Sequence, residues 1–118
     1  GLVIDYGYFE PNYGDTLQAL KNSRYSDVLA EPGRADLTAH VNFKMLRETA
    51  QACGLDYALN TQGEVLKRCG IEYRAQALMR IANDKQRLEI QQALHRLCGS
   101  DEMGVLFKVI EISKGNKG

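Results

Sequence analysis

A single carboxylate, Asp5, is the residue of this sequence best placed to do chemistry. It follows the apolar run Leu2–Ile4 and precedes Tyr6 and Gly7. A run that is apolar on both faces is typical of a buried parallel strand, and open α/β sheets bind ligands outside the carboxyl ends of such strands. A carboxylate at that place can orient a cationic substrate or accept a proton. The same place also suits an Asp that caps the following turn through backbone N–H groups, so both interpretations stay open.

Three polar residues at a spacing of two form a second candidate site. Asp36, Thr38 and His40 alternate with apolar residues, which predicts an extended segment over 36–41 with one polar face. These side chains can line a cleft, but the pattern alone favours a solvated strand face. Asp5 and His40 also match two members of a hydrolase triad, yet the sequence has no G-x-S-x-G elbow to supply a nucleophile. A hydrolase would therefore need its nucleophile upstream of this chain.

Several other kinds of site lack their sequence signal. The chain has no G-x-G-x-x-G motif and no P-loop, so nothing in it is predicted to cradle a nucleotide phosphate. His40 and His95 lie far apart in the sequence, and we expect no metal site. The three cysteines lack C-x-x-C spacing, and each directly precedes a glycine that can end a helix. They are predicted to be buried residues in the last turns of helices: Cys53, Cys69 and Cys98.

The composition is that of an ordinary globular α/β chain. The 118 residues include 15 Lys and Arg against 15 Asp and Glu, so the formal net charge is zero. This balance argues against a nucleic-acid partner, because phosphate binding needs a basic excess. No apolar run is long enough to span a membrane, and the sequence does not open with a signal segment. We therefore expect an intracellular protein.

Periodicity and capping residues predict the elements that position the candidate residues. Asn42 can cap a helix that Gly54 ends, and Thr61 and Glu64 form a capping box that opens another helix. Further apolar stripes at helical spacing predict two more helices before residue 99. The predicted order begins with a strand over 1–6, an irregular excursion over 8–35 and an extended segment over 36–41. A helix over 42–53, a strand over 55–59 and three helices within about 62–99 follow. The last elements are a strand over 105–112 near a sheet edge and a flexible polar tail over 113–118.

The apolar first strand has too few predicted neighbours. A strand that is buried on both faces needs a hydrogen-bonding partner on each side and helices over the sheet. The remaining strands of this sequence cannot supply all of these. We therefore expect an incomplete sheet, with the chain being a piece of a larger protein whose other strands precede Gly1.

Five segments of the sequence occur in an order and spacing that resemble one family. They are Ile4–Gly7 (IDYG), Gly14–Ala19 (GDTLQA), Pro32–Phe43 (PGRADLTAHVNF), Thr61–Gly63 (TQG) and Met103–Lys108 (MGVLFK). This pattern resembles the C-terminal part of the MidA-like (DUF185) S-adenosylmethionine-dependent methyltransferases. That family includes mitochondrial complex I assembly factors that act as protein arginine methyltransferases. The resemblance spans almost the whole chain, and Asn42 stands where the family usually has an Asp.

The resemblance implies an α/β fold, the C-terminal part of a class I (Rossmann-like) methyltransferase domain covering residues 1–112. The strands at 1–6, 55–59 and 105–112 would be its fifth, sixth and antiparallel seventh strands. The helices at about 62–99 would be an insertion before the last strand, and 113–118 a flexible tail. Most of the S-adenosyl-L-methionine pocket would lie before Gly1, so this chain is expected to be inactive on its own.

The resemblance also implies a reaction, which is N-methylation of arginine on a protein substrate, related to respiratory complex I in the mitochondrial relatives. Because a guanidinium is protonated at neutral pH, a carboxylate that grips it can aim one nitrogen at the methyl group. The hypothesis gives this catalytic role to Asp5. The residues expected to shape the substrate pocket are Tyr6, Gly7, Asp36, Thr38 and His40. The alternative is a non-catalytic docking or assembly-factor module.

The partners expected from the resemblance are a protein substrate and no nucleic acid. A homodimer is a further possibility, because an exposed strand edge invites pairing with another chain. The expected compartment is the cytoplasm if the source is bacterial and the mitochondrial matrix if it is eukaryotic.

Overall fold

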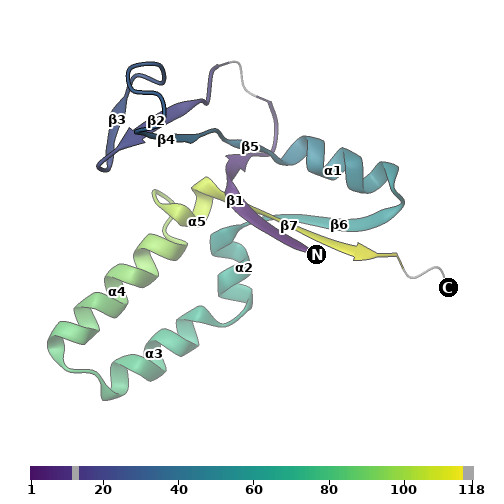
Figure 1. The fold of residues 1–118 in the computed structure, drawn as a ribbon. Coiled ribbons are helices and arrows are strands. Elements are labelled where there is room, and N and C mark those ends of the chain that lie inside the picture. The colour runs from purple at the N-terminus through teal and green to yellow at the C-terminus, as the bar shows by residue number, and fades with distance from the viewer. Residues whose placement is uncertain (12–13, 116–118) are drawn as a thin grey trace.

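A four-stranded sheet is the centre of the molecule in the computed structural model, which describes residues 1–11 and 14–115. Figure 1 shows this sheet with a helix along one side and a helical arm leaving one end. The strand order is β5-β1-β7-β6. The strands are β1 (Leu2–Tyr8), β5 (Val41–Asn42), β6 (Leu55–Thr61) and β7 (Phe107–Lys114).

The last strand, β7, lies inside the sheet and runs antiparallel to both of its neighbours. Val109 pairs with Ile4 of β1, and Ile110 pairs with Leu59 of β6. The antiparallel orientation agrees with the expected seventh strand, but the expectation of a place near a sheet edge is wrong. Position in a sheet depends on pairing with segments far away in the sequence, which the alternation of a single strand does not record.

The boundaries of β7 also differ from the prediction. Residues 103–106 form a short helix, α5 (Met103–Leu106), so the strand begins at Phe107. Ser113 and Lys114, predicted to belong to a flexible tail, pair with β6 as the last residues of β7. Residues 116–118 of that predicted tail lie outside the described residues.

The first strand is much less buried than predicted. Leu2, Val3 and Ile4 are 57%, 39% and 43% exposed. Along residues 2–6 its partner is β7, while the parallel partner on its other side, β5, meets it only at Gly7 and Tyr8. Apolar strands become buried when neighbours cover both their edges and faces. The described part of the chain supplies only some of that cover for β1, which has the composition of a central strand and the exposure of an edge.

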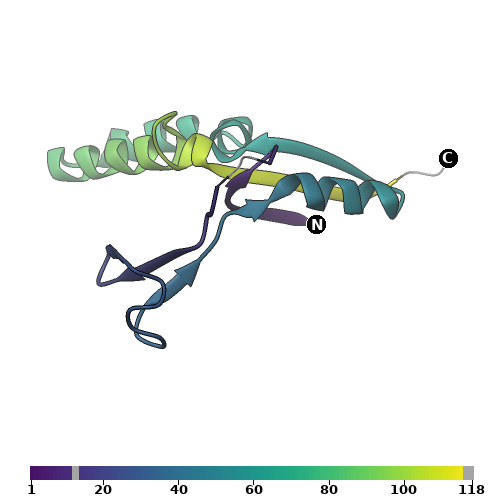
Figure 2. The same ribbon diagram turned by 90° about the horizontal axis from the view of Figure 1, so that it is seen from above.

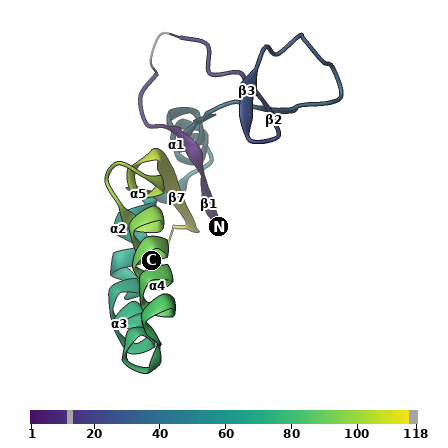
Figure 3. The ribbon, with the colours of Figure 1, turned by 90° about the vertical axis from the view of Figure 1, so that its left-hand side faces the viewer.

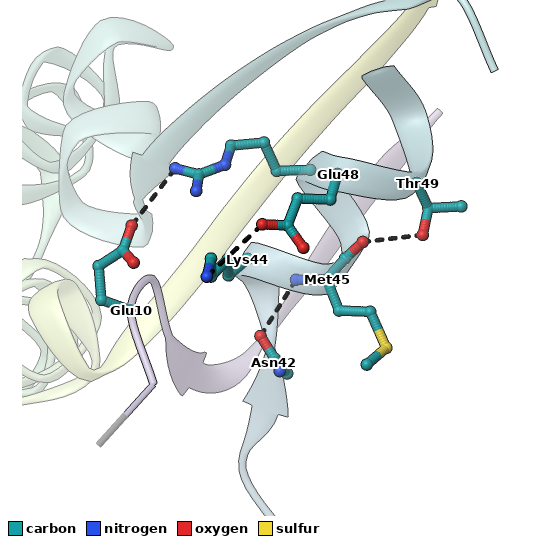
Figure 4. A network of polar contacts seen from close by, with 7 residues as sticks. Glu10, Asn42, Lys44, Met45, Glu48 and Thr49 are labelled. Atoms are coloured by element: carbon teal, nitrogen blue, oxygen red, sulfur yellow. Dashed lines mark hydrogen bonds and ion pairs between the residues drawn. The ribbon is translucent and has the colours of Figure 1, made fainter. Parts of the chain in front are cut away.

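The core lies where the sheet meets helix α1 (Phe43–Ala52). Phe43 of α1 is completely buried, as are Val109 and Ile110 of β7, which as consecutive strand residues point to opposite faces of the sheet. Asn42 caps α1 as predicted, because its side-chain oxygen accepts the Met45 N–H at 3.1 Å (Figure 4). Beyond this capped first turn, an ion pair joins α1 to the segment that follows β1.

Two ion pairs stabilise α1 from outside the core (Figure 4). The Arg47 guanidinium donates to the Glu10 carboxylate at 3.4 Å, which joins the helix to the chain leaving β1. Lys44 and Glu48, one turn apart, lie 3.6 Å from each other. Exposed pairs of this kind contribute only a few tenths of a kcal/mol each, so α1 is held mainly by Phe43.

A second, smaller sheet forms within the excursion after β1, where the sequence predicted mostly irregular structure. Its order is β3-β2-β4, and Figure 2 shows it set apart from the main sheet. Asn22 and Ser23 both have positive φ angles, of 52° and 61°, as a tight hairpin turn requires. The strands are β2 (Gln18–Lys21), β3 (Arg24–Ser26) and β4 (Asp36–Thr38).

Three helices follow β6, as predicted, and two of them form an arm (Figures 1 and 3). They are α2 (Gln62–Arg68), α3 (Ile71–Ile81) and α4 (Asp84–Cys98). Helices α3 and α4 pack side by side as a hairpin that projects away from the sheet.

The glycines predicted to end helices do so in two of three places. Gly54 and Gly70 have φ angles of 67° and 85°, the left-handed conformation that ends a helix at little cost in glycine. Gly99 instead has a φ of −63° and leaves α4 in an extended conformation, while its N–H bonds the His95 carbonyl. A left-handed residue is thus not what ends α4.

The capping box of α2 makes part of the stability depend on pH. The Glu64 carboxylate accepts the Thr61 N–H at 2.8 Å, and this bond with that of the Thr61 hydroxyl lowers the Glu64 pKa below its ordinary value of 4.5. A lowered pKa gives stability that is present above the ordinary pKa and is lost as the pH falls through the folded-state value. We expect Glu64→Ala in the full-length protein to lower the melting temperature at pH 7, with the gap to wild type narrowing below about pH 4. An equal difference in melting temperature between variant and wild type at pH 7 and below about pH 4 would contradict this.

Candidate functional site

Two predicted pocket residues meet at the carboxyl end of β1. The rings of Tyr6 and His40 lie edge to face, with centroids 4.3 Å apart. On its other side Tyr6 packs against Phe107 of β7, with ring centroids 5.7 Å apart. The register explains this contact, because Tyr6 and Phe107 are directly opposite each other on antiparallel strands. Tyr6 therefore holds the His40 ring against the main sheet.

The His40 side chain has an unsatisfied polar atom. Its backbone N–H donates to the Thr16 hydroxyl at 3.2 Å, which fixes the loop that carries it. Its Nε2 atom is buried and has no hydrogen-bond partner within residues 1–11 and 14–115. An unpaired buried polar atom costs about 1–3 kcal/mol, so such atoms are enriched where a ligand or another group completes the bond.

Gly7 has a packing role at the same place. A Cβ atom added to Gly7 would lie 2.3 Å from the Val41 carbonyl oxygen and 2.7 Å from the Phe43 ring. The chain of β5 and the first residue of α1 therefore press directly against β1. Only glycine allows this approach, which brings His40 and its neighbours up to the end of β1.

Asp5 lies on the opposite face of the sheet from the Tyr6–His40 pair, because consecutive residues of a strand alternate between faces. Its carboxylate is exposed, and Oδ1 accepts the N–H of Tyr6 at 2.7 Å. The bond satisfies a neighbouring N–H, as the alternative interpretation of Asp5 expected, but the predicted place at the carboxyl end of the strand is wrong, because β1 continues from Asp5 to Tyr8. No hydrogen bond to the other carboxylate oxygen occurs within the described ranges. Asp5 is thus a local cap with one oxygen still available for a ligand.

A lysine that the sequence analysis did not single out lies opposite Asp5. Lys108 of β7 pairs with Asp5 in the strand register, so the two side chains share one face of the sheet. Its ammonium donates to the Val105 carbonyl and lies 5.3 Å from the centroid of the Phe9 ring. Burial lowers the pKa of this ammonium below its ordinary value. In the sequence, Lys108 stands out only as the last residue of the Met103–Lys108 segment, with no role indicated for it.

Asp36 and Thr38 do not join the other candidates. Both are exposed on β4, where they pair with Leu20 and Gln18 of the smaller sheet. The predicted extended segment is interrupted after β4, so His40 leaves the face that Asp36 and Thr38 share. His40 is half-buried against Tyr6 while Asp36 and Thr38 are exposed, so the three side chains do not line one surface as the pattern predicted.

The cysteines are less buried than predicted. Cys53 and Cys69 are exposed, because both lie at the C-caps of their helices where the chain turns to solvent. Cys98, the last residue of α4, is half-buried, and burial raises the pKa of its thiol. No disulfide is formed among the three.

This difference predicts an order of cysteine reactivity. Because the thiolate is the nucleophile, a raised pKa leaves a smaller fraction of Cys98 in the reactive form at a given pH. We expect Cys98 in the full-length protein to react with iodoacetamide at pH 8 several-fold more slowly than Cys53 and Cys69, as measured by mass spectrometry of timed samples. Equal rates for the three cysteines would contradict the burial of Cys98.

The described residues contain neither a cluster of metal ligands nor a helix that could cross a membrane. Within residues 1–11 and 14–115, no three His, Cys, Asp or Glu side chains are grouped so that they could hold a metal ion. In the same ranges, no helix has the length and apolarity that a membrane crossing requires.

Comparison with known proteins identifies the family. The model of a family described as "Putative S-adenosyl-L-methionine-dependent methyltransferase" matches residues 1–61, which is more than half of the chain. The chain belongs to this family. The MidA-like (DUF185) resemblance of its sequence motifs is thereby confirmed.

Curated relatives of this methyltransferase family match most of the chain. The "Protein arginine methyltransferase NDUFAF7 homolog, mitochondrial" of Caenorhabditis elegans is 35% identical over 108 residues, which are 91% of this chain and 25% of the relative. The human "Protein arginine methyltransferase NDUFAF7, mitochondrial" is 35% identical over 107 residues, or 90% of this chain and 24% of the relative. The chain thus spans about a quarter of the length of these relatives.

Two crystal structures of family proteins from Burkholderia thailandensis share the fold. One has a TM-score of 0.83 and 33% identity, covering 99% of this chain and 33% of that protein. The other, solved with S-adenosyl-homocysteine bound, has a TM-score of 0.80 and 32% identity, covering 99% of this chain and 32% of that protein. The expected fold class, an α/β Rossmann-like methyltransferase fragment, is confirmed.

The residues of this chain do not by themselves fit a complete S-adenosylmethionine pocket. No glycine-rich turn joins a strand directly to a helix here, since β1 leads into a long excursion and β6 passes straight into α2. Among the buried polar side-chain atoms of residues 1–11 and 14–115, Nε2 of His40 alone lacks a partner, and it supplies a single hydrogen-bonding group near the end of β1. No catalytic step through the cofactor is therefore derived from these residues.

Proposed function

We propose that this chain is the C-terminal part of an S-adenosyl-L-methionine-dependent methyltransferase that N-methylates arginine on a protein substrate. The observation that carries the proposal is the match of 99% of the chain, at a TM-score of 0.80, to a protein crystallised with S-adenosyl-homocysteine, the product that methyl transfer leaves from that donor. The names of the curated relatives support arginine as the acceptor. The missing donor pocket belongs to residues before Gly1.

The domain boundaries follow from the same proposal. Residues 1–112 belong to the methyltransferase domain, and the helices within about 62–99 are an insertion before its last strand. The free edge of β1 over residues 2–6 supports this, because a further strand can pair there and cover Leu2–Ile4. With that strand in place, β1 would have the central position that its apolar sequence is suited to.

The carboxylate of Asp5 is proposed to bind the substrate guanidinium. It lies in the middle of β1, three residues before the strand's carboxyl end, and one of its oxygens is available to a ligand that reaches past that end. A carboxylate that accepts hydrogen bonds from a guanidinium offsets its charge and holds one nitrogen in line for attack.

The Tyr6–Gly7–His40 cluster is proposed to contact the substrate at the end of β1, with the rings of Tyr6 and His40 on the other face of the sheet from Asp5. Its support is the buried Nε2 atom of His40, which needs a hydrogen-bond partner, and the close packing at Gly7 that positions it. Asp36 and Thr38, exposed on the smaller sheet, are proposed to contact residues of the substrate protein farther from the methylated arginine.

A methyl-transfer assay tests the proposal. The full-length protein is incubated with methyl-labelled S-adenosylmethionine and a peptide containing arginine, with the same peptide carrying lysine instead as the matched control. We expect label on the arginine peptide only. Absence of transfer to any protein arginine, from a protein that binds the labelled donor, would favour the alternative of a non-catalytic docking or assembly module.

The proposed compartment depends on the source. The C. elegans and human relatives are named mitochondrial proteins. We propose the mitochondrial matrix for a eukaryotic source and the cytoplasm for a bacterial one, which fractionation of cells producing the tagged full-length protein would test.

A further inference from the structure

The arm formed by α3 and α4 carries an apolar groove that nothing in the described chain covers. The groove has two adjoining hollows, of about 460 Å³ and 270 Å³. Leu78, Ile90 and Ala93 line both hollows. Ile81, at the end of α3, is 86% exposed in the larger one. Exposed apolar patches of this kind, rimmed by polar residues, mark protein interaction sites.

The spacing of the groove residues is that of an open helical bundle. Residues 71, 74, 75 and 78 of α3 and residues 86, 89, 90, 93, 94 and 97 of α4 line the two hollows. This i, i+3, i+4, i+7 pattern is the stripe that helices of bundles bury against one another. A two-helix hairpin has only half of the helices such a core needs, so another helical pair of matching pattern would complete it.

Two charged residues at opposite ends of the groove indicate which helical pair would complete the bundle. Arg74 lines the hollow nearer the sheet, and Glu89 lines the hollow nearer the tip of the arm. Within the part of the chain that the structure describes, neither has an ion-pair partner. A two-fold axis through the shared residues would reverse the direction of a second hairpin. Arg74 of each copy would then lie at the same end of the interface as Glu89 of the other, diagonally across the bundle core.

We propose that the α3–α4 arm is a dimerisation surface on which the same arm of a second copy packs to form an antiparallel four-helix bundle. The apolar centre of the groove, around Leu78 and Ile90, would be buried against itself, as a two-fold interface requires. This surface differs from the strand edge of β1 that the sequence suggested for a homodimer. On the fold proposed above, that edge is taken by the chain's own preceding strand.

Charge reversal in the full-length protein tests this arrangement, with mass measured by analytical ultracentrifugation. Wild type is expected to be a dimer at micromolar concentration. Arg74→Glu alone and Glu89→Arg alone should each weaken the dimer ~100-fold, because symmetry places two like-charged contacts in every interface. The double variant should restore the dimer. Arg80→Glu, an exposed change on α3 outside the groove, is the matched control and should leave the dimer intact.

The outcomes separate clearly. A monomeric wild type would overturn the proposal and leave the groove to the chain's own preceding residues. Single reversals that leave the dimer unchanged would also overturn it, since the dimer would then use another surface. Circular dichroism on each variant confirms that it is folded. The measurement needs no methyl transfer, so it can fail or succeed independently of the proposed enzymatic function.

Discussion

Replacing Asp5 with Asn in the full-length protein is expected to lower kcat for methyl transfer to an arginine peptide by ~100-fold or more. An Asn side chain keeps an oxygen that can accept the Tyr6 N–H, so the local cap seen at 2.7 Å survives the change. What is lost is the negative charge that would hold the guanidinium and offset its positive charge. The variant therefore separates the chemical role of Asp5 from its structural one.

Steady-state kinetics with S-adenosylmethionine and the arginine peptide measure this effect. Asp56→Asn, the same change at an exposed position of β6, is the matched control and should leave kcat unaltered. An unchanged kcat for the Asp5 variant, with its melting temperature preserved, would return Asp5 to the role of a local cap. A rise in KM alone would indicate that Asp5 binds the substrate without acting in the transition state.

Replacing Gly7 with Ala is expected to lower the free energy of unfolding by about 3 kcal/mol, at the upper end of what overpacking costs. The added methyl group would lie 2.3 Å from the Val41 carbonyl oxygen, and a backbone atom cannot rotate away as a long side chain can. The completely buried Phe43 ring blocks retreat on the same side. Relieving the overlap would move β5 away from β1 and His40 with it.

Chemical denaturation of the full-length protein measures this cost. Gly1→Ala is the matched control, because a Cβ added at Gly1 meets nothing within 4 Å. A Gly7 variant as stable as wild type would show that β5 shifts freely. The packing at Gly7 would then not be what positions His40.

Local features were the most predictable part of this fold. The cap at Asn42 and the capping box of Thr61 and Glu64 need only residues within one helical turn, and both occur as predicted. The glycine stops at Gly54 and Gly70 were predictable for the same reason, because their φ angles depend on the helix they end. Each of these interactions is complete within a few neighbouring residues.

Features that depend on distant pairing were not predictable from pattern. The central place of β7 requires Leu2 to pair with Glu111 and Leu55 to pair with Lys114, and the strand's own alternation is the same at an edge or inside a sheet. In the smaller sheet, β4 lies within the extended segment predicted over 36–41, but its pairing with β2 and β3 was missed, because these strands are only three or four residues long. Strands that short carry almost no periodic signal.

The candidate site was only partly predictable. Tyr6, Gly7 and His40 come together because β1 and β5 meet at Gly7, and the sequence contains each residue without recording that contact. The division of Asp5 and Tyr6 between opposite faces was available from the period of two, since they are consecutive in a strand. Lys108 could be placed opposite Asp5 only once the register of β7 was known.

Because β7 lies between β1 and β6, the main sheet cannot form completely until β7 has been synthesised. β1 and β6 are not neighbours in the sheet, and the strand that pairs with both of them, β7, follows both in the chain. While the ribosome is still adding residues 62–106, the edges of β1 and β6 that pair with β7 are unpaired. Chaperones commonly bind nascent chains in such a state. A stop codon between residues 62 and 106 would remove the strand that pairs with both β1 and β6, so we expect the truncated product to be prone to aggregation.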